Sequence, residues 1–126
     1  MPRKSLELMT ESMLYTMMAF QTGPRCGTEI SACVAGLTKG RVLLGPGTLY
    51  TILNKFLEVG YLREVAVEGR KRTYALTAEG RRAYEQELER LRQCLRDAAS
   101  APSFALEEGG AAHEGPDLAP APLPAL

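Results

Sequence analysis

Three helices in the N-terminal part of the chain are predicted by apolar residues that recur every three or four positions, the period of an amphipathic helix. The first helix is expected to end at Gly23-Pro24, and the second to begin near Thr28, a residue type that often caps helices. The third opens at Gly45-Pro46-Gly47, where proline suits the first turn, and is expected to end at about Val59. The apolar residues of the first helix are Leu6, Met9, Met13, Met17 and Phe20. Those of the third helix are Leu49, Ile52, Leu53, Phe56 and Leu57.

Two alternating segments follow the third helix and predict a β-hairpin over residues 62–67 and 71–76, joined by a tight turn at Glu68-Gly69-Arg70. Thr77 then caps a long helix that reaches about Ala99. The apolar residues of this helix are Tyr84, Leu88, Leu91, Leu95 and Ala98. Their spacing alternates between four and three, which is the heptad seam of a coiled coil.

The narrow apolar seam of the last helix predicts that it pairs with a second copy of the chain. A helix of this length, at about 1.5 Å per residue, would extend beyond the small domain that precedes it. A twofold homodimer is the simplest solution, and the alternative is a helix folded back on its own domain. The residues assigned to dimerisation are Met9, Met13, Met17, Tyr84, Leu88, Leu91 and Leu95.

These elements together predict a mainly α fold with a small β-hairpin, a winged helix-turn-helix followed by a long C-terminal dimerisation helix. We expect a winged helix domain over 1–76, the dimerisation helix over 77–99, and a disordered or peripheral acidic tail rich in Ala and Pro over 100–126. The chain has neither an apolar membrane span nor a signal-peptide core. Its three cysteines form no C-x-x-C pair, which favours reduced thiols. A cytoplasmic protein without a membrane partner is therefore expected.

The formal net charge of zero conceals an uneven distribution along the chain. Residues 1–99 contain all 15 lysines and arginines but only eleven of the 15 acidic residues, which leaves a net charge of +4. The four remaining acidic residues follow residue 99, where the net charge is −4. Because phosphate binding depends on locally presented charge, the basic body is compatible with a nucleic-acid partner.

The third predicted helix carries a polar face opposite its apolar stripe. The residues on or beside this face are Thr48, Tyr50, Thr51, Asn54 and Lys55. Small and polar side chains at these positions suit insertion into a DNA major groove, where Asn54 can pair with adenine and Lys55 can reach guanine or phosphate. Such a face is more often simply solvated. The adjoining hairpin favours DNA binding over a merely solvated face. Arg70, Lys71 and Arg72 are consecutive at its tip, and a phosphate backbone or minor groove would supply their counter-charge.

The linked spacings of three motifs resemble the PadR family of transcriptional regulators over roughly residues 6 to 96. The first motif is Gly47-Thr48-Leu49-Tyr50-x-x-Leu53. The second is Leu57-Glu58-x-Gly60-Tyr61-Leu62. The third is Gly69-Arg70-Lys71-Arg72-x-Tyr74-x-Leu76-Thr77-x-x-Gly80-Arg81. The single short C-terminal helix resembles the compact branch of that family.

The resemblance implies a dimeric winged helix repressor that binds double-stranded DNA. The helix with Thr48, Tyr50 and Asn54 would enter the major groove, the hairpin at 70–72 would contact the backbone or minor groove, and the C-terminal helix would dimerise with the first helix. The chain departs from the family at the start of the second helix. There it reads Cys26-Gly27-Thr28-Glu29 instead of an aromatic residue or His followed by Gly-Tyr-Glu.

All five methionines lie within the first eighteen residues. Because methionine-rich faces adapt to irregular shapes, a small hydrophobic effector bound between the two protomers is one hypothesis. Packing in the dimer core is the alternative, and it is favoured because stripes at helical spacing usually pack. The family often uses aromatic side chains between protomers for sensing, and this chain has no Trp.

Three other classes of function compete with a DNA-binding regulator. An enzyme is disfavoured because the one histidine, His113, lies in the tail and no catalytic motif is present. A thiol or metal sensor would use Cys26 and Cys33, but their spacing is not that of common metal sites. A winged helix protein-interaction module that has lost DNA binding is the third, and the basic hairpin argues against it. We therefore expect no catalytic residue, cofactor or metal.

Overall fold

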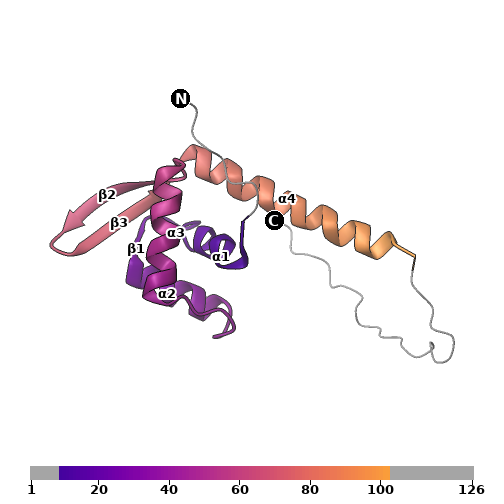
Figure 1. The fold of residues 1–126 in the computed structure, drawn as a ribbon, viewed down its shortest axis with the longest axis horizontal. Helices are drawn as coiled ribbons and strands as arrows, with labels where there is room; N and C mark the ends of the chain where they lie inside the picture. The colour runs from indigo at the N-terminus through magenta and orange to yellow at the C-terminus, as the bar shows by residue number, and fades with distance from the viewer. Residues whose placement is uncertain (1–8, 103–126) are drawn as a thin grey trace. The chain divides into compact units, whose positions relative to one another are not determined.

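The computed structural model describes residues 9–102, which form four helices and a three-stranded sheet (Figure 1). The elements in order are α1 (Glu11–Ala19), β1 (Arg25–Cys26), α2 (Gly27–Leu37), α3 (Pro46–Glu58), β2 (Leu62–Glu68), β3 (Lys71–Leu76) and α4 (Ala78–Ser100). The chain divides into two compact units, Met1–Cys94 and Leu95–Leu126. The first unit therefore includes most of α4, whereas the sequence places a boundary at 76/77. The predicted tail lies almost wholly outside the described residues.

Helix α1 begins at Glu11, behind a cap formed by Thr10. The Thr10 hydroxyl accepts a hydrogen bond from the backbone N–H of Met13 at 3.1 Å, which satisfies one of the free donors of the first turn. Met9 precedes the helix, and the predicted helical position Leu6 lies outside the described residues. The helix is consequently shorter than the apolar stripe that predicts it.

Helix α2 begins one residue earlier than predicted, because the preceding residues are held in a strand. Arg25 and Cys26 pair antiparallel with β3, opposite Tyr74 and Thr73. Cys26 becomes the N-cap residue of α2, so Thr28 lies inside the first turn and does not cap it. The sequence does not reveal β1, since two residues are too few to show an alternation.

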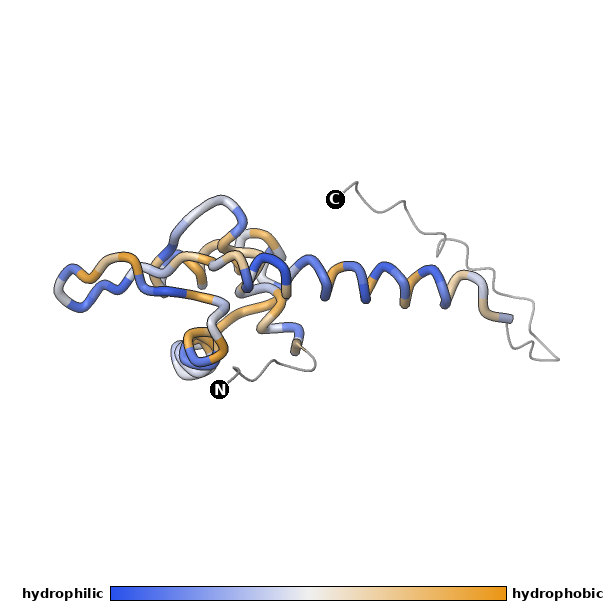
Figure 2. Tube along the Cα trace, turned by 90° about the horizontal axis from the view of Figure 1, so that it is seen from above, coloured by the Kyte–Doolittle hydropathy of each residue, from blue (hydrophilic) through white to orange (hydrophobic). Residues whose placement is uncertain are grey.

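The hairpin of β2 and β3 extends away from the helices, and its residues beyond Leu62 on β2 are exposed (Figures 1 and 2). Gly69 has φ +63°, which favours glycine, and the turn is shorter than predicted because β2 continues to Glu68. The strand order is β1-β3-β2, and the register shifts between Glu64 and Ala66. The predicted hairpin is therefore confirmed, and β1 adds a third strand beside β3.

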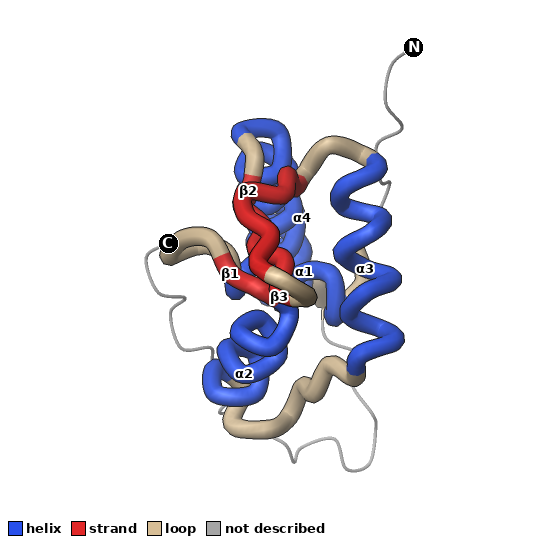
Figure 3. The backbone as a smooth tube through the Cα atoms, turned by 90° about the vertical axis from the view of Figure 1, so that its left-hand side faces the viewer, coloured by secondary structure: helices blue, strands red, loops and turns tan. Residues whose placement is uncertain are grey.

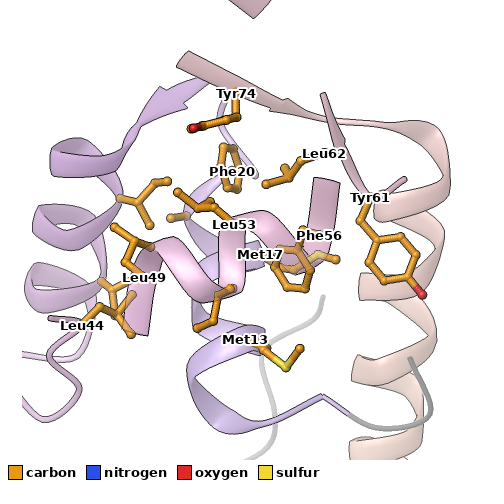
Figure 4. Packing of buried hydrophobic residues seen from close by; sticks show 14 of the residues in the cluster. Met13, Met17, Phe20, Leu44, Leu49, Leu53, Phe56, Tyr61, Leu62 and Tyr74 are labelled. Atoms are coloured by element: carbon orange, nitrogen blue, oxygen red, sulfur yellow. The ribbon is translucent and has the colours of Figure 1, made fainter. Parts of the chain in front are cut away.

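Helices α1, α2 and α3 pack against one another, and Figure 3 shows α3 to the right of the strands and α2 below them. The predicted apolar stripe of α3 is confirmed, since Leu49, Ile52, Leu53 and Phe56 are all buried in the core (Figure 4). Met17 is also part of this core, with none of its side chain exposed. Met17 is therefore enclosed by its own protomer and exposes no surface in the single chain, although the sequence pattern assigns it to dimerisation.

Helix α4 is held at its N-terminus by hydrogen bonds to the segment that follows α3. The Thr77 hydroxyl donates to the carbonyl of Gly60 at 2.6 Å and accepts from the N–H of Gly80 at 3.0 Å, so it joins two elements and caps α4 as predicted. Gly80 is buried against the carbonyl of Tyr61, where a Cβ atom would lie only 2.2 Å from that oxygen. Within residues 9–102, no helix has the length and apolar character needed to span a membrane.

Candidate nucleic-acid interface

The polar face predicted on α3 is exposed. Thr48, Thr51, Asn54 and Lys55 are all accessible along it, while the opposite face of the helix is buried. The Thr51 hydroxyl donates to the carbonyl of Gly47 at 2.9 Å, so its oxygen can still accept a hydrogen bond from a ligand. Because α3 has no acidic residue in its first turn, this surface can approach a polyanion.

Two hollows flank the exposed face of α3. A groove of about 780 Å³ separates α3 from the start of α1. The lining residues of this groove are Thr10, Ser12, Met13, Gly47, Thr48, Thr51, Ile52 and Lys55. A second cavity of about 490 Å³ lies on the other flank, between α3, the start of α2 and the hairpin. The lining residues of this cavity, called here the basic cavity, are Cys26, Gly27, Thr28, Glu29, Tyr50, Arg70, Lys71, Arg72 and Tyr74.

Tyr50 connects α3 to the basic cavity. Half of its surface is exposed, and its hydroxyl lies 3.0 Å from the position that a Cβ atom on Gly27 would occupy. Glycine at position 27 therefore allows the Tyr50 ring to lie directly on the first turn of α2. The structure thus brings Tyr50 together with the three predicted hairpin cations, whereas Asn54 lines neither hollow.

The three cations of the hairpin are exposed, but they differ in their partners. Arg72 forms an ion pair with Glu64 of the neighbouring strand, with 2.7 Å between Nη1 and Oε2, and this hydrogen bond raises the pKa of the guanidinium. Glu64 therefore supplies Arg72 with a counter-charge within the protein, which the sequence pattern did not predict. Burial, with a further contribution from Glu64, raises the pKa of Tyr74 beside this pair, so its phenol is neutral at physiological pH.

The start of α2 is the part of this surface that the sequence does not assign to the interface. It reaches the basic cavity because β1 pairs with β3 and thereby fixes the first turn of α2 beside the hairpin. Glu29 accepts a hydrogen bond from the N–H of Cys26 at 2.9 Å. This bond, a second one from the Cys26 side chain and the charges of Lys71 and Arg25 lower the pKa of Glu29.

The predicted dimerisation residues are buried to very different degrees. Met13 and Tyr84 each expose only 9% of their surface and belong to the protomer core, as Met17 does. Met9, Leu88 and Leu91 are half-buried. Leu95, in the second unit, is 54% exposed. Apolar surface that a partner could cover therefore remains on Met9, Leu88, Leu91 and Leu95.

The cysteines are dispersed over the described part of the chain. Cys26 is buried, Cys33 is half-buried and Cys94 is exposed. Within residues 9–102, no three His, Cys, Asp or Glu side chains are grouped as metal ligands would be.

Three packed helices, a β-hairpin wing and an exposed polar third helix define the winged helix class. Residues 13–86 match the transcriptional regulator PadR-like family. The protein therefore belongs to the PadR-like family of transcriptional regulators, and the resemblance drawn from its motifs is confirmed. No curated protein matches the chain.

Several solved structures share the fold at low sequence identity. A transcriptional regulator from Clostridium thermocellum is 22% identical over 72% of this chain and 92% of its own, with a TM-score of 0.63. A PadR-like transcription factor from Bacteroides fragilis is 23% identical over 70% of this chain and 85% of its own, with a TM-score of 0.57. Bacillus subtilis PadR in complex with operator DNA is 17% identical over 78% of this chain and 51% of its own, with a TM-score of 0.50.

Proposed function

We propose that this protein is a cytoplasmic, sequence-specific DNA-binding repressor that binds a palindromic operator as a homodimer. The observation that carries the proposal is the exposed polar face of α3 beside an exposed cationic hairpin. A helix of this kind reads base edges in the major groove, while cations at a hairpin tip contact the backbone or minor groove. The family membership and the operator complex of the Bacillus subtilis protein support the same function.

In this proposal the residues of the interface have separate roles. Asn54, with Thr48 and Thr51, reads bases, and Lys55 contacts guanine or phosphate. Tyr50, Arg70, Lys71 and Arg72 hold the DNA backbone from the basic cavity and the wing. Residues 77–99 form the dimerisation helix through Leu88, Leu91 and Leu95, and Met9 contributes further apolar surface.

The proposal includes a small hydrophobic effector that releases the DNA. Met13 and Ile52 provide an apolar floor for the groove between α1 and α3, which also contains Thr48 and Lys55. Its volume is within the range of about 300–1,000 Å³ that is common for ligand sites. A ligand there would occupy the surface that α3 presents to DNA. A panel of phenolic compounds that changes neither the melting temperature nor the DNA affinity would contradict this part of the proposal.

Footprinting of the region upstream of the protein's own gene tests the DNA-binding function. We expect two protected half-sites about 34 Å apart. Lys71→Ala should weaken binding to all duplexes and reduce the salt slope by about one for each lost phosphate contact. Asn54→Ala should cost roughly 1–3 kcal/mol at one base position only. If both variants weakened all sequences equally, the separate roles of wing and helix would be refuted.

A further inference from the structure

One carboxylate, that of Glu29, is among the residues that line the basic cavity. Glu29 lines this cavity together with Arg70, Lys71 and Arg72, and its Oε1 atom accepts the backbone N–H of Cys26 at 2.9 Å. It is exposed, and it faces Lys71 and Arg25 closely enough for their charges to lower its pKa. At neutral pH the cavity therefore contains a fixed negative charge at the start of α2.

The position of this charge matters because the start of a helix attracts anions. Unpaired backbone N–H groups and the helix dipole favour a negative group there, and the neighbouring lysine and arginines add to the attraction. Glu29 already accepts a hydrogen bond from one backbone N–H group, that of Cys26, and its charge offsets part of the nearby positive charge. A phosphate that approaches Tyr50 and Lys71 thus meets a site that is partly occupied and a carboxylate that repels it.

We propose that Glu29 acts as a built-in competitor of DNA phosphate in the basic cavity, and that it limits sequence-independent binding. The inference rests on the proposed DNA-binding function. Backbone contacts are equal on every sequence, so a residue that weakens them lowers affinity for random DNA and leaves discrimination to α3. Glu29 then limits the strength of the sequence-independent backbone contacts, and it needs no contact with a base to do so.

The test is Glu29→Gln, which keeps a carbonyl oxygen to accept the Cys26 N–H but removes the charge. Fluorescence anisotropy would measure binding of the full-length protein to its operator and to an unrelated duplex of equal length, across a salt series. We expect affinity for the unrelated duplex to rise roughly fivefold per protomer at low salt, the effect of one unit charge at about 4 Å in water. The gain should shrink as salt screens the charge.

The matched control is Glu85→Gln on α4, which changes the net charge equally at an exposed residue outside the basic cavity. We expect it to change affinity less than twofold. Equal effects of Glu29→Gln and Glu85→Gln, or a loss of affinity with Glu29→Gln, would overturn the inference. Failure of the wild type to bind either duplex at low salt would instead refute the proposed function.

A second variant keeps the test decisive if Glu29→Gln does not fold. Thr28 lines the same cavity and is exposed in the first turn of α2, where an added carboxylate suits the helix dipole. Thr28→Asp should lower affinity for both duplexes by a similar factor while it preserves the melting temperature. Unchanged affinity in this variant would show that negative charge in the cavity does not oppose DNA.

Discussion

Gly80→Ala provides a direct test of how α4 is joined to the winged helix unit. The new Cβ atom would lie 2.2 Å from the carbonyl oxygen of Tyr61 and 2.9 Å from Cδ1 of Leu76. Real Cβ atoms essentially never lie within 3.0 Å of another heavy atom, so α4 and the Tyr61 carbonyl must separate to accommodate the new methyl group. The oxygen belongs to the backbone and accepts the N–H of Thr77 at 3.0 Å, so it cannot move away independently.

The change in the free energy of unfolding caused by Gly80→Ala has three contributions. Overpacking of a core typically costs about 1–3 kcal/mol, and a weakened Thr77 hydrogen bond adds about 1 kcal/mol. The better helix propensity of alanine returns about 1 kcal/mol. We therefore expect the free energy of unfolding to fall by about 1–3 kcal/mol, which lowers Tm by roughly 5–15 °C.

Thermal and urea unfolding followed by circular dichroism would measure this change at a fixed protein concentration. Gly36→Ala is the matched control, because Gly36 is exposed on α2 and a Cβ atom there would meet nothing within 4 Å. This control should be stabilised by up to about 1 kcal/mol, through helix propensity alone. If the two variants changed Tm in the same direction, the close approach of α4 to Tyr61 would not constrain the fold.

Three further predictions concern dimerisation, the position of Tyr50 and pH. Leu91→Glu should yield a folded monomer in analytical ultracentrifugation, because it places a charge on the predicted seam; a persistent dimer would disprove the pairing. Gly27→Ala should displace the flexible end of Tyr50 and reduce DNA affinity with little change in Tm, and unchanged affinity would show that Tyr50 makes no contact. Because the folded-state pKa of Glu29 is lowered, its stabilising effect is present above the ordinary carboxyl pKa and lost as pH falls through the folded value. The stability difference between wild type and Glu29→Gln should thus shrink as pH falls below the ordinary carboxyl pKa of about 4.3; a difference that does not shrink there would contradict this assignment.

The periodic part of the fold can be predicted from the sequence. The apolar stripe of α3, the two strands of the hairpin and the Thr77 cap each depend on neighbours in the chain, and local patterns report such neighbours well. The N-terminus of α2 depends on pairing between residues almost fifty positions apart, Arg25 and Tyr74. No local pattern records that contact, so both β1 and the contribution of α2 to the basic cavity were absent from the prediction.

The dimerisation residues show a different limit. Met17 and Leu91 both occupy apolar stripes of helical period, and periodicity identifies which face is apolar but not what covers it. The structure resolves this for Met17, which the protomer itself encloses, and leaves Leu91 half-buried. The Arg72–Glu64 pair was likewise missed, because strand alternation alone does not locate the register shift between Glu64 and Ala66.

The hydrogen bonds around Thr77 have a consequence for how a signal could travel. Gly60 and Tyr61 lie just beyond Val59, the C-cap residue of α3, and they contact Thr77 and Gly80 at the start of α4. The end of α3 and the start of α4 are therefore connected through a short segment held by hydrogen bonds. If α4 pairs with its copy as proposed, a small rotation between the paired helices would change the distance between the α3 helices of the two protomers. A changed distance would weaken binding to half-sites on two successive turns of DNA.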